Sequence, residues 1–423
     1  MESYMKISIL LCIYGIFKEF RPSEPYLVPI MTEPPLNFTA AQVSQEIFPV
    51  STYSSFIFLV IVFLITDFMR YKIIIILQAI CAIATYLIII LCRGVFLMQV
   101  MQVVYGLYMA SEVAYYTYIY AKVEKDHYQE VTSFTRSAYL IGRCLSGVAS
   151  QLAVNYNLTT YEGLLWITVG SEVLALIWAI LLPSVDRSMY FHRDTSLEQK
   201  STGDNESNIT SNKCSLVANF LWFDFKSGFT NVYVVKWALW WALATCGYYL
   251  VTSYVQILWK VIITESGSDT VQYNGAVETI YTILGACATM IMGRVTLNWK
   301  FLGEFILGAC SLLITFLLMT MSMTLNVFVA YITFIALTLI YQTMITVAYS
   351  EVAKHVNRDS HGLIFGVTTF AVYLFQSIFT YIALQVYQLE IRVQFEVYAL
   401  YYGVLGVIFM VMAFVSCKAH LFS

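Results

Sequence analysis

Charged residues are scarce in this sequence of 423 residues: 12% are Asp, Glu, Lys or Arg, whereas 59% are hydrophobic. A soluble domain carries about 25% charged residues. Half of that share is too little to cover a water-facing surface of this size, so most of the outer surface must face lipid. The formal net charge of −3 gives the whole chain no bias towards nucleic acid or acidic partners. The composition therefore indicates a membrane protein.

Catalytic and metal-binding patterns are also missing. The nine cysteines form no CxxC pair and lie mostly in apolar runs, so they are interpreted as small packing residues. The five histidines have no spacing typical of metal ligands, and no serine or cysteine stands in a nucleophile motif such as GxSxG. These absences argue against a disulfide framework, a metal site and a membrane enzyme, and we expect no cofactor.

The N-terminus resembles a signal peptide at first sight. Its apolar stretch, Ile7 to Phe17, runs directly into the charged residues 18–21 and has no small-residue cleavage site. We therefore expect this stretch to begin a first membrane helix that is retained.

Twelve segments are apolar and long enough for a membrane-crossing helix, which needs about 20 residues. They cover residues 7–30, 49–67, 72–91, 95–121, 129–154, 162–183, 234–259, 271–293, 301–321, 325–350, 360–388 and 392–416. The only long polar stretch, 184–233, follows the sixth segment and predicts a linker. We expect an all-α protein with an N-terminal six-helix half (1–183), a cytoplasmic linker (184–233) and a C-terminal six-helix half (234–423). This is the 6+6 layout of the major facilitator architecture, whose halves surround a midplane site.

The placement of Lys and Arg predicts the orientation. If both termini are cytoplasmic, nearly all basic residues outside the spans lie on the cytoplasmic side, and Arg93, Lys260 and Arg392 alone lie on the outer side. This asymmetry is the positive-inside pattern. In this orientation the sequons at Asn37 and Asn157 fall on outer loops, which makes both asparagines candidate glycosylation sites.

Ionisable residues inside the spans are few. A charge in hydrocarbon costs roughly 2.5–3.5 kcal/mol on insertion scales, so these residues must face a water-filled cavity or one another. In the first span, Pro22 and Pro25 each remove a backbone donor and bend the helix. We interpret this region as a broken helix with Glu24 facing a central cavity. The alternative is that part of the run caps the helix at the membrane surface.

Glu112 lies deep in the fourth span, and Tyr108, Tyr115 and Tyr116 share its helix face at i−4, i+3 and i+4. A carboxylate beside aromatic rings suits a cationic ring, through charge pairing and cation–π attraction. Arg143 of the fifth span could neutralise Glu112, or it could bind a carboxylate or phosphate bidentately. The residues alone leave both roles of Arg143 open.

Polar and aromatic residues also gather in the second half. Tyr248 and Tyr249 crowd the seventh span, Glu278 lies in the eighth, and Gln376 is a polar position in the eleventh. An aromatic stripe in a membrane helix is more often packing or an interface belt than a ligand platform. Its coincidence with Glu278 favours a binding role here.

Several motifs, in order along the chain, make the sequence similar to a known family. They are Arg21-Pro-Ser-Glu-Pro25, Glu46-Ile-Phe-Pro-Val50, Thr66-Asp-Phe-Met-Arg-Tyr-Lys72, Glu112-Val-Ala-Tyr-Tyr116, Trp240-Trp241, Tyr254-Val-Gln-Ile-Leu-Trp259 and Tyr273-Asn-Gly-Ala276. Through nearly all the transmembrane region they resemble the reduced folate carrier and thiamine transporter family (solute carrier family 19), in a form similar to its nematode members. The resemblance implies vitamin uptake across the plasma membrane by alternating access, with protons or a counter-transported anion as candidate coupling partners.

The positions that separate the branches of this family disagree. Three carboxylates resemble the acidic positions of thiamine carriers: Glu24, Glu112 and Glu278. Thr338 and Gln376 stand where vertebrate folate carriers have basic residues. Ser51 and Arg143 depart from thiamine carriers, and Arg143 resembles nematode-type folate carriers. We favour thiamine or a similar organic cation as the substrate, with a reduced folate as the alternative.

The resemblance and the spacing together suggest a mechanism. Glu24 and Glu112, helped by Glu278, would hold the positive charge of the substrate. Four tyrosines would stack on its ring: Tyr115, Tyr116, Tyr248 and Tyr249. A buried carboxylate disfavours its charged form, so we expect Glu112 to take a proton when the substrate leaves, which would link transport to pH.

A charge cluster at the cytoplasmic end of the second span contains Asp67, Arg70 and Lys72. The major facilitator fold commonly has a gating cluster at this place, and ordinary positive-inside anchoring is the alternative. A function of another class also stays open. Divergence at Ser51 and Arg143 would accompany the conversion of a transporter into a membrane receptor that binds without moving its ligand.

Overall fold

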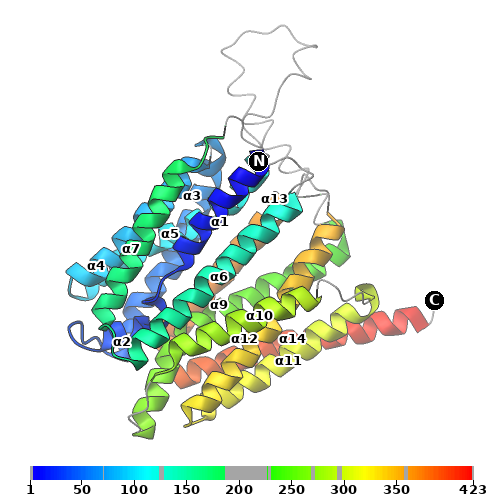
Figure 1. Cartoon of the computed structure of the whole chain (residues 1–423). Helices are drawn as coiled ribbons and strands as arrows, with labels where there is room; N and C mark the ends of the chain where they lie inside the picture. The colour runs from blue at the N-terminus through cyan, green and yellow to red at the C-terminus, as the bar shows by residue number, and fades with distance from the viewer. Residues whose placement is uncertain are drawn as a thin grey trace.

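The computed structural model describes residues 3–69, 71–122, 128–185, 226, 230–267, 272–292, 298–356 and 361–421. Its regular elements in this part of the chain are helices (Figure 1). Most of the expected linker at 184–233, together with Arg70, lies outside the described residues.

The N-terminal helices begin with an interrupted span. They are α1 (Ser3–Glu19), η1 (Glu24–Tyr26), α2 (Leu27–Thr32), η2 (Gln42–Ile47), α3 (Phe48–Phe68), α4 (Lys72–Leu91), α5 (Val95–Lys122), α6 (Tyr128–Asn155) and α7 (Tyr161–Leu181). The C-terminal helices are α9 (Val232–Ser266), α10 (Asn274–Met292), α11 (Trp299–Met323), α12 (Val327–Lys354), α13 (His361–Thr380), η6 (Tyr381–Val386) and α14 (Ile391–Leu421). Each expected apolar segment corresponds to one of these helices or to a helix continued by a short η turn.

The helices have the length and the surface of membrane spans. Within the described residues, nine are long and apolar enough to cross a membrane by composition alone. The other three expected spans are α1, α5 and α6, which carry charged side chains of the site described below. Large apolar side chains such as Leu91, Phe96 and Phe316 are exposed on the outside of the bundle, as lipid contact requires.

The expected interruption of the first span is confirmed. The α1 helix ends at Glu19, a 3₁₀ turn follows at Glu24–Tyr26, and α2 continues from Leu27. Pro22 and Pro25 explain the break, because each lacks the N–H that an α-helix needs. The expected end of the seventh span at residue 259 was too early, since α9 continues to Ser266.

Two groups of helices make up the bundle. The helices α1 to α7 pack mainly on one another, as do α9 to α14, and α6 against α10 and α3 against α13 join the groups. Figure 1 shows α6 lying beside α10, with the start of α1 and the α2 helix at opposite ends of the bundle.

The contact between α6 and α10 depends on two glycines. A Cβ on Gly147 would lie 2.7 Å from the carbonyl oxygen of Gly275, and a Cβ on Gly275 would lie 2.7 Å from that of Gly147. Real Cβ atoms do not approach backbone this closely, so a side chain at either position forces the two helices apart. This is the close backbone approach that small residues allow between membrane helices.

We expect Gly147→Ala to lower the thermal midpoint of the purified protein. Overpacking a tight contact costs about 1–3 kcal/mol. Gly170→Ala in α7 is the matched control, because nothing lies within 4 Å of its Cβ. Thermal unfolding in detergent, followed by size-exclusion chromatography, checks both variants. Equal midpoints for the two variants would contradict the close-packing argument.

Candidate functional site

A buried lysine connects the end of α1 to the fourth span. The Lys18 Nζ lies 2.5 Å from each carboxylate oxygen of Glu112 in α5 and 3.1 Å from Oε1 of Glu19. Gln78 of α4 donates a hydrogen bond of 2.5 Å to Glu112 Oε2 and accepts one of 2.8 Å from the hydroxyl of Tyr14. Glu112 therefore faces a cation and an amide donor.

A second basic residue links the two sides of the helix break. The Nη2 of Arg21 lies 3.2 Å from Oε2 of Glu19 and 3.1 Å from Oε2 of Glu24, and its guanidinium lies over the ring of Tyr108. The helix break makes these ion pairs possible, because it lets the side chains of Glu19, Arg21 and Glu24 contact one another.

The carboxylates of this network differ in access to solvent. The side chains of Lys18 and Glu19 are 1% and 3% exposed, whereas those of Glu112 and Glu24 are 26% and 28% exposed. About a quarter of each of these two acidic side chains is thus exposed. The expectation that Glu24 reaches an accessible space fits this geometry.

Arg143 pairs with Glu278 and not with Glu112, so the expected alternative of a Glu112–Arg143 pair was wrong for this structure. Its Nε and Nη2 donate to Glu278 Oε1 at 3.0 and 2.6 Å, its Nη1 donates to the Tyr139 hydroxyl at 3.0 Å, and its Nη2 also donates to the Tyr281 hydroxyl at 3.1 Å. The pair forms across the close α6–α10 contact. All three guanidinium nitrogens are therefore engaged by the protein.

The paired side chains leave an excess of negative charge. Three cations, Lys18, Arg21 and Arg143, face four carboxylates in these described ion pairs: Glu19, Glu24, Glu112 and Glu278. The networks together hold one net negative charge. Such a site favours a monovalent cation over an anion, because an unbalanced charge in low-dielectric surroundings is costly.

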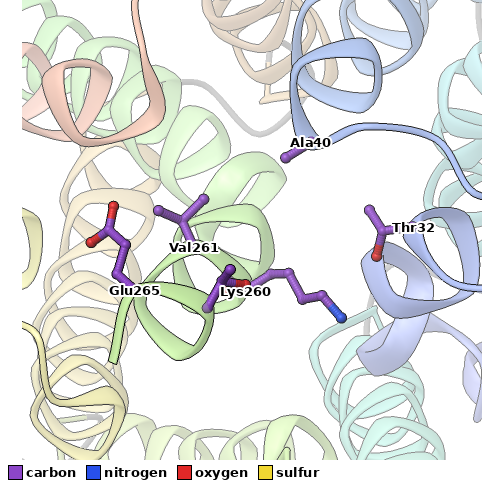
Figure 2. Close-up of a pocket in the computed structure, with 6 residues that line it drawn as sticks. Thr32, Ala40, Lys260, Val261 and Glu265 are labelled. Atoms are coloured by element: carbon purple, nitrogen blue, oxygen red, sulfur yellow. Dashed lines mark hydrogen bonds between the residues drawn. The ribbon is translucent and has the colours of Figure 1, made fainter. Parts of the chain in front are cut away.

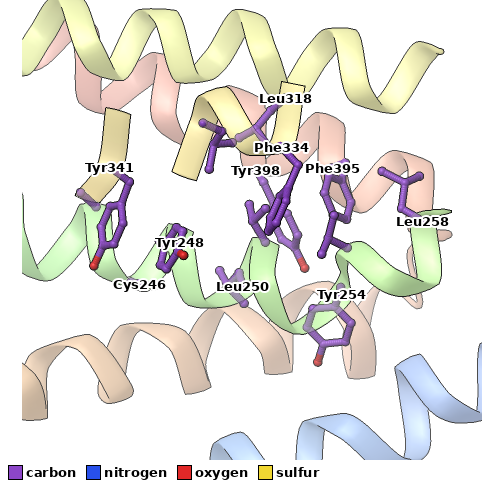
Figure 3. Close-up of a cluster of buried hydrophobic side chains, with 14 of the residues drawn as sticks. Cys246, Tyr248, Leu250, Tyr254, Leu258, Leu318, Phe334, Tyr341, Phe395 and Tyr398 are labelled. Atoms are coloured by element: carbon purple, nitrogen blue, oxygen red, sulfur yellow. The ribbon is translucent and has the colours of Figure 1, made fainter. Parts of the chain in front are cut away.

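The tyrosines expected to contact a ligand lie in different surroundings. Tyr115 is fully buried, and its hydroxyl donates a hydrogen bond of 3.2 Å to the carbonyl oxygen of Leu11. The Nζ of Lys18 lies over its ring in a cation–π contact, so Tyr115 stabilises that lysine. Tyr248 stacks on Tyr341 of α12, with ring centroids 3.9 Å apart and an interplanar angle of 10° (Figure 3).

Tyr249 is half-buried and has its ring 6.0 Å from that of Tyr373. It is thus more open than Tyr248. The side chain of Tyr116 lies outside the described part of the structure.

Four buried polar residues of α12 and α13 have a side-chain atom without a hydrogen-bond partner in the described structure: Thr338, Gln376, Ser377 and Thr380. Thr338 and Gln376 are the two that stand where vertebrate folate carriers have basic residues. The Oε1 of Gln376 and the Oγ1 of Thr338 have no hydrogen-bond partner, and both residues are at most 4% exposed. Buried polar atoms normally have partners, so these two are available to a ligand or to water. Neither carries the positive charge that would attract a carboxylate tail.

The remaining predicted sites lie at the two ends of the bundle. Lys72 is half-buried at the start of α4, while the side chain of Asp67 and the whole of Arg70 lie outside the described residues. Asn37 and Asn157 are both exposed on loops at the other end, in the places expected of glycosylation sites.

A pocket of about 380 Å³ lies at the α2 end, between α2 and α9 (Figure 2). Its lining residues are Thr32, Ala40, Lys260, Val261, Thr264 and Glu265. The Nζ of Lys260 lies 2.7 Å from Oε1 of Glu33, so this lysine already has a partner. The pocket is separate from the charged networks.

Sequence reasoning missed several residues of the site. Lys18 and Arg21 were seen as part of a helix break but not as the ion-pair partners of Glu112 and Glu24, and Glu19 was not seen as the partner that both share. Gln78 gave no signal, because one glutamine in an apolar helix has no partner in its own segment. Glu172, a lone carboxylate within the apolar span α7, was a visible signal that was overlooked.

The chain is similar over nearly its whole length to proteins of one family. The family model for the reduced folate carrier matches residues 2–397. Human Thiamine transporter 2 is 35% identical over 97% of this chain and 90% of its own length. Folate transporter 1 of Caenorhabditis elegans is 35% identical over 96% of this chain and 91% of its own length.

Solved structures show the fold. The crystal structure of the POT family transporter PepTSo matches with a TM-score of 0.68 at 10% identity, covering 99% of each chain. The nucleoside transporter NupG matches with a TM-score of 0.60 at 12% identity, covering 97% of this chain and 99% of its own. The expected all-helical major facilitator architecture is thereby confirmed, and the helices of the described residues agree with the expected apolar segments.

Proposed function

The chain belongs to the reduced folate carrier family, and we propose that it carries thiamine or a similar organic cation into the cell by alternating access. The observation that carries the proposal is the contrast between Arg143 and the two accessible carboxylates. Every nitrogen of the Arg143 guanidinium is engaged, whereas Glu24 and Glu112 remain about a quarter exposed. In this conformation the site presents negative charge to a ligand and withholds positive charge.

The substrate cation would compete with the protein's own cations. Lys18 occupies both oxygens of Glu112, and Arg21 holds Glu24. Both basic residues also contact Glu19, so each keeps one partner when a substrate takes the other carboxylate. An incoming cation therefore leaves neither Lys18 nor Arg21 as an unpaired buried charge, which would be costly.

The proposed movement is a rocking of two six-helix halves, residues 1–183 and 234–423, about the site. In this structure hydrogen bonds join the halves at the α2 end: Gln256 Nε2 donates to the Glu24 carbonyl at 3.0 Å, and Asn274 Nδ2 donates to the Pro25 carbonyl at 2.9 Å. With both termini in the cytoplasm, this end faces outwards. The structure then corresponds to a state closed to the outside, in a protein of the plasma membrane whose Asn37 and Asn157 are accessible to glycosylation.

A reduced folate is the second candidate. It is favoured by the 35% identity to Folate transporter 1 of Caenorhabditis elegans and by the presence of Arg143 at the site. For a folate to bind through Arg143, its carboxylate would have to displace Glu278 from the two hydrogen bonds that it accepts from Arg143. The net negative charge of the ion-pair networks also opposes the binding of an anion.

Uptake of labelled thiamine and of a labelled reduced folate, measured side by side in cells without their own carriers, tests the proposal. We expect thiamine to accumulate above vector-transfected cells and excess unlabelled thiamine to suppress it, while the folate stays at background. Accumulation of the folate alone would overturn the cation assignment. Surface binding of thiamine without accumulation would indicate a receptor. If protein at the cell surface transports and binds neither compound, the substrate is a different molecule and the cation assignment to thiamine is wrong.

A further inference from the structure

Gln78 is a fully buried amide in α4, a helix whose other buried residues are mostly apolar. The Nε2 of Gln78 donates to Glu112 Oε2 at 2.5 Å, and its Oε1 accepts from the Tyr14 hydroxyl at 2.8 Å. Burying an amide costs free energy unless it is hydrogen-bonded, and here both ends of the amide have a partner. Gln78 thus links α1 to α5 through a continuous chain of hydrogen bonds.

The direction of each hydrogen bond in this chain follows from Glu112. An ionised carboxylate only accepts hydrogen bonds, so it requires the nitrogen end of the Gln78 amide. The oxygen end then faces Tyr14, whose hydroxyl donates to it. Tyr14 is itself fully buried, and its ring centroid lies 5.4 Å from that of Tyr115. The Gln78 amide is therefore bound at both ends and held in one orientation.

Gln78 and Lys18 contact the carboxylate of Glu112 differently. The Lys18 Nζ lies 2.5 Å from both oxygens, whereas the Gln78 amide contacts Oε2. Under the proposed function a substrate cation displaces Lys18, which keeps Glu19 as its partner. Gln78 carries no charge and is held by Tyr14, so it stays on Oε2 during this exchange. The oxygen that Lys18 exposes to the substrate is then Oε1.

We propose that Gln78, held by Tyr14, is a positioning residue for cation transport: it fixes the Glu112 carboxylate at Oε2 and directs Oε1 to the substrate. This inference rests on the proposed function. A carboxylate that is fixed in advance loses less freedom when the substrate binds, which strengthens binding without any contact between Gln78 and the substrate. A neutral amide suits this role, because another cation in its place would cancel the charge that attracts the substrate.

The KM of thiamine uptake, at equal amounts of protein at the cell surface, tests the proposal. Gln78→Leu nearly keeps the size of the side chain and removes the donor to Glu112. We expect it to raise KM about tenfold, the order expected for one lost hydrogen bond to a charged group, with little change in the maximal rate. Tyr14→Phe removes only the hydroxyl that orients the amide, so we expect a smaller rise of KM.

A double-mutant cycle separates positioning from packing. If Gln78 acts through the carboxylate, Gln78→Leu should add no further rise of KM to a chain that already carries Glu112→Gln. Thr85→Val is the matched control for a polar-to-apolar exchange in the same helix. Thr85 is buried and donates to the carbonyl oxygen of Cys81 at 2.8 Å, so its substitution should leave KM unchanged.

Three results overturn the inference and leave the transport proposal intact. They are a normal KM in Gln78→Leu, an equal rise of KM from Gln78→Leu with and without Glu112→Gln, and a rise of the same size in Thr85→Val. If Gln78→Leu does not reach the cell surface, Tyr14→Phe decides, and a wild-type KM in that variant overturns the inference. Absence of thiamine uptake by the wild type refutes the proposed function itself.

Discussion

Glu112→Gln is expected to reduce the efficiency of thiamine uptake by about 10- to 100-fold. A hydrogen bond to a charged group contributes about 1.5–3 kcal/mol, and each 1.4 kcal/mol corresponds to about tenfold in affinity. Glutamine keeps the size of the side chain and an oxygen that accepts from Lys18, so the substitution removes the charge with little change in packing. The loss should appear mainly as a higher KM.

Initial rates of thiamine uptake over a range of concentrations, corrected for the amount of protein at the surface, measure this effect. Glu112→Asp is the control that retains the charge, and Glu162→Gln is the control for the same substitution at an exposed position. We expect Glu112→Asp to keep more activity than Glu112→Gln. Uptake by Glu112→Gln with an unchanged KM would mean that Glu112 only forms an ion pair with Lys18 and does not bind the substrate.

The second large effect is expected from Arg143→Ala, which should destabilise the protein by about 3 kcal/mol. Breaking one side of a buried ion pair costs about 3–5 kcal/mol, because the other charge is left without compensation. The lower value applies here, since the Arg143 side chain is 25% exposed and that of Glu278 is 10% exposed. The pair crosses the α6–α10 contact, so its loss should also weaken the contact between the two halves.

The double variant Arg143→Met with Glu278→Gln separates a structural role from a binding role. We expect it to recover most of the thermal midpoint lost in Arg143→Ala, because no unpaired charge remains. Thermal unfolding in detergent and uptake assays check both variants. If Arg143→Ala has a normal thermal midpoint but selectively loses uptake of a reduced folate, the arginine is an anion site, and the cation assignment is wrong.

Much of the fold could be predicted because membrane helices are specified locally. A span needs about 20 apolar residues and satisfies its own backbone hydrogen bonds, so a run such as Lys72–Leu91 identifies a helix without knowledge of its neighbours. The break in the first span was equally visible, since Pro22 and Pro25 lack donors wherever the helix packs. The few ionisable residues at membrane depth, among them Glu24, Glu112, Arg143 and Glu278, were also identified from the chain alone.

The partners of these charged residues could not be predicted in the same way. Arg143 could reach Glu112 or Glu278, and the choice depends on how α6 is rotated and how closely it approaches α10 across Gly147 and Gly275. Lys18 looked like the end of a helix, yet in the folded bundle its Nζ lies 2.5 Å from both carboxylate oxygens of Glu112. The accessibility of Glu24 follows from the same packing.

The sequence by itself determined the class of the protein, the approximate positions of its membrane helices, the interruption of the first one and the resemblance to its family. Only the tertiary structure decided which charges pair, which carboxylates stay exposed, and that Glu172 is buried without a hydrogen-bond partner in the described structure. The physical reason is the distance along the chain over which each interaction acts. Apolar length and missing backbone donors act within one segment, whereas an ion pair forms between side chains far apart in the chain, and its partner is set by the rotation and spacing of packed helices.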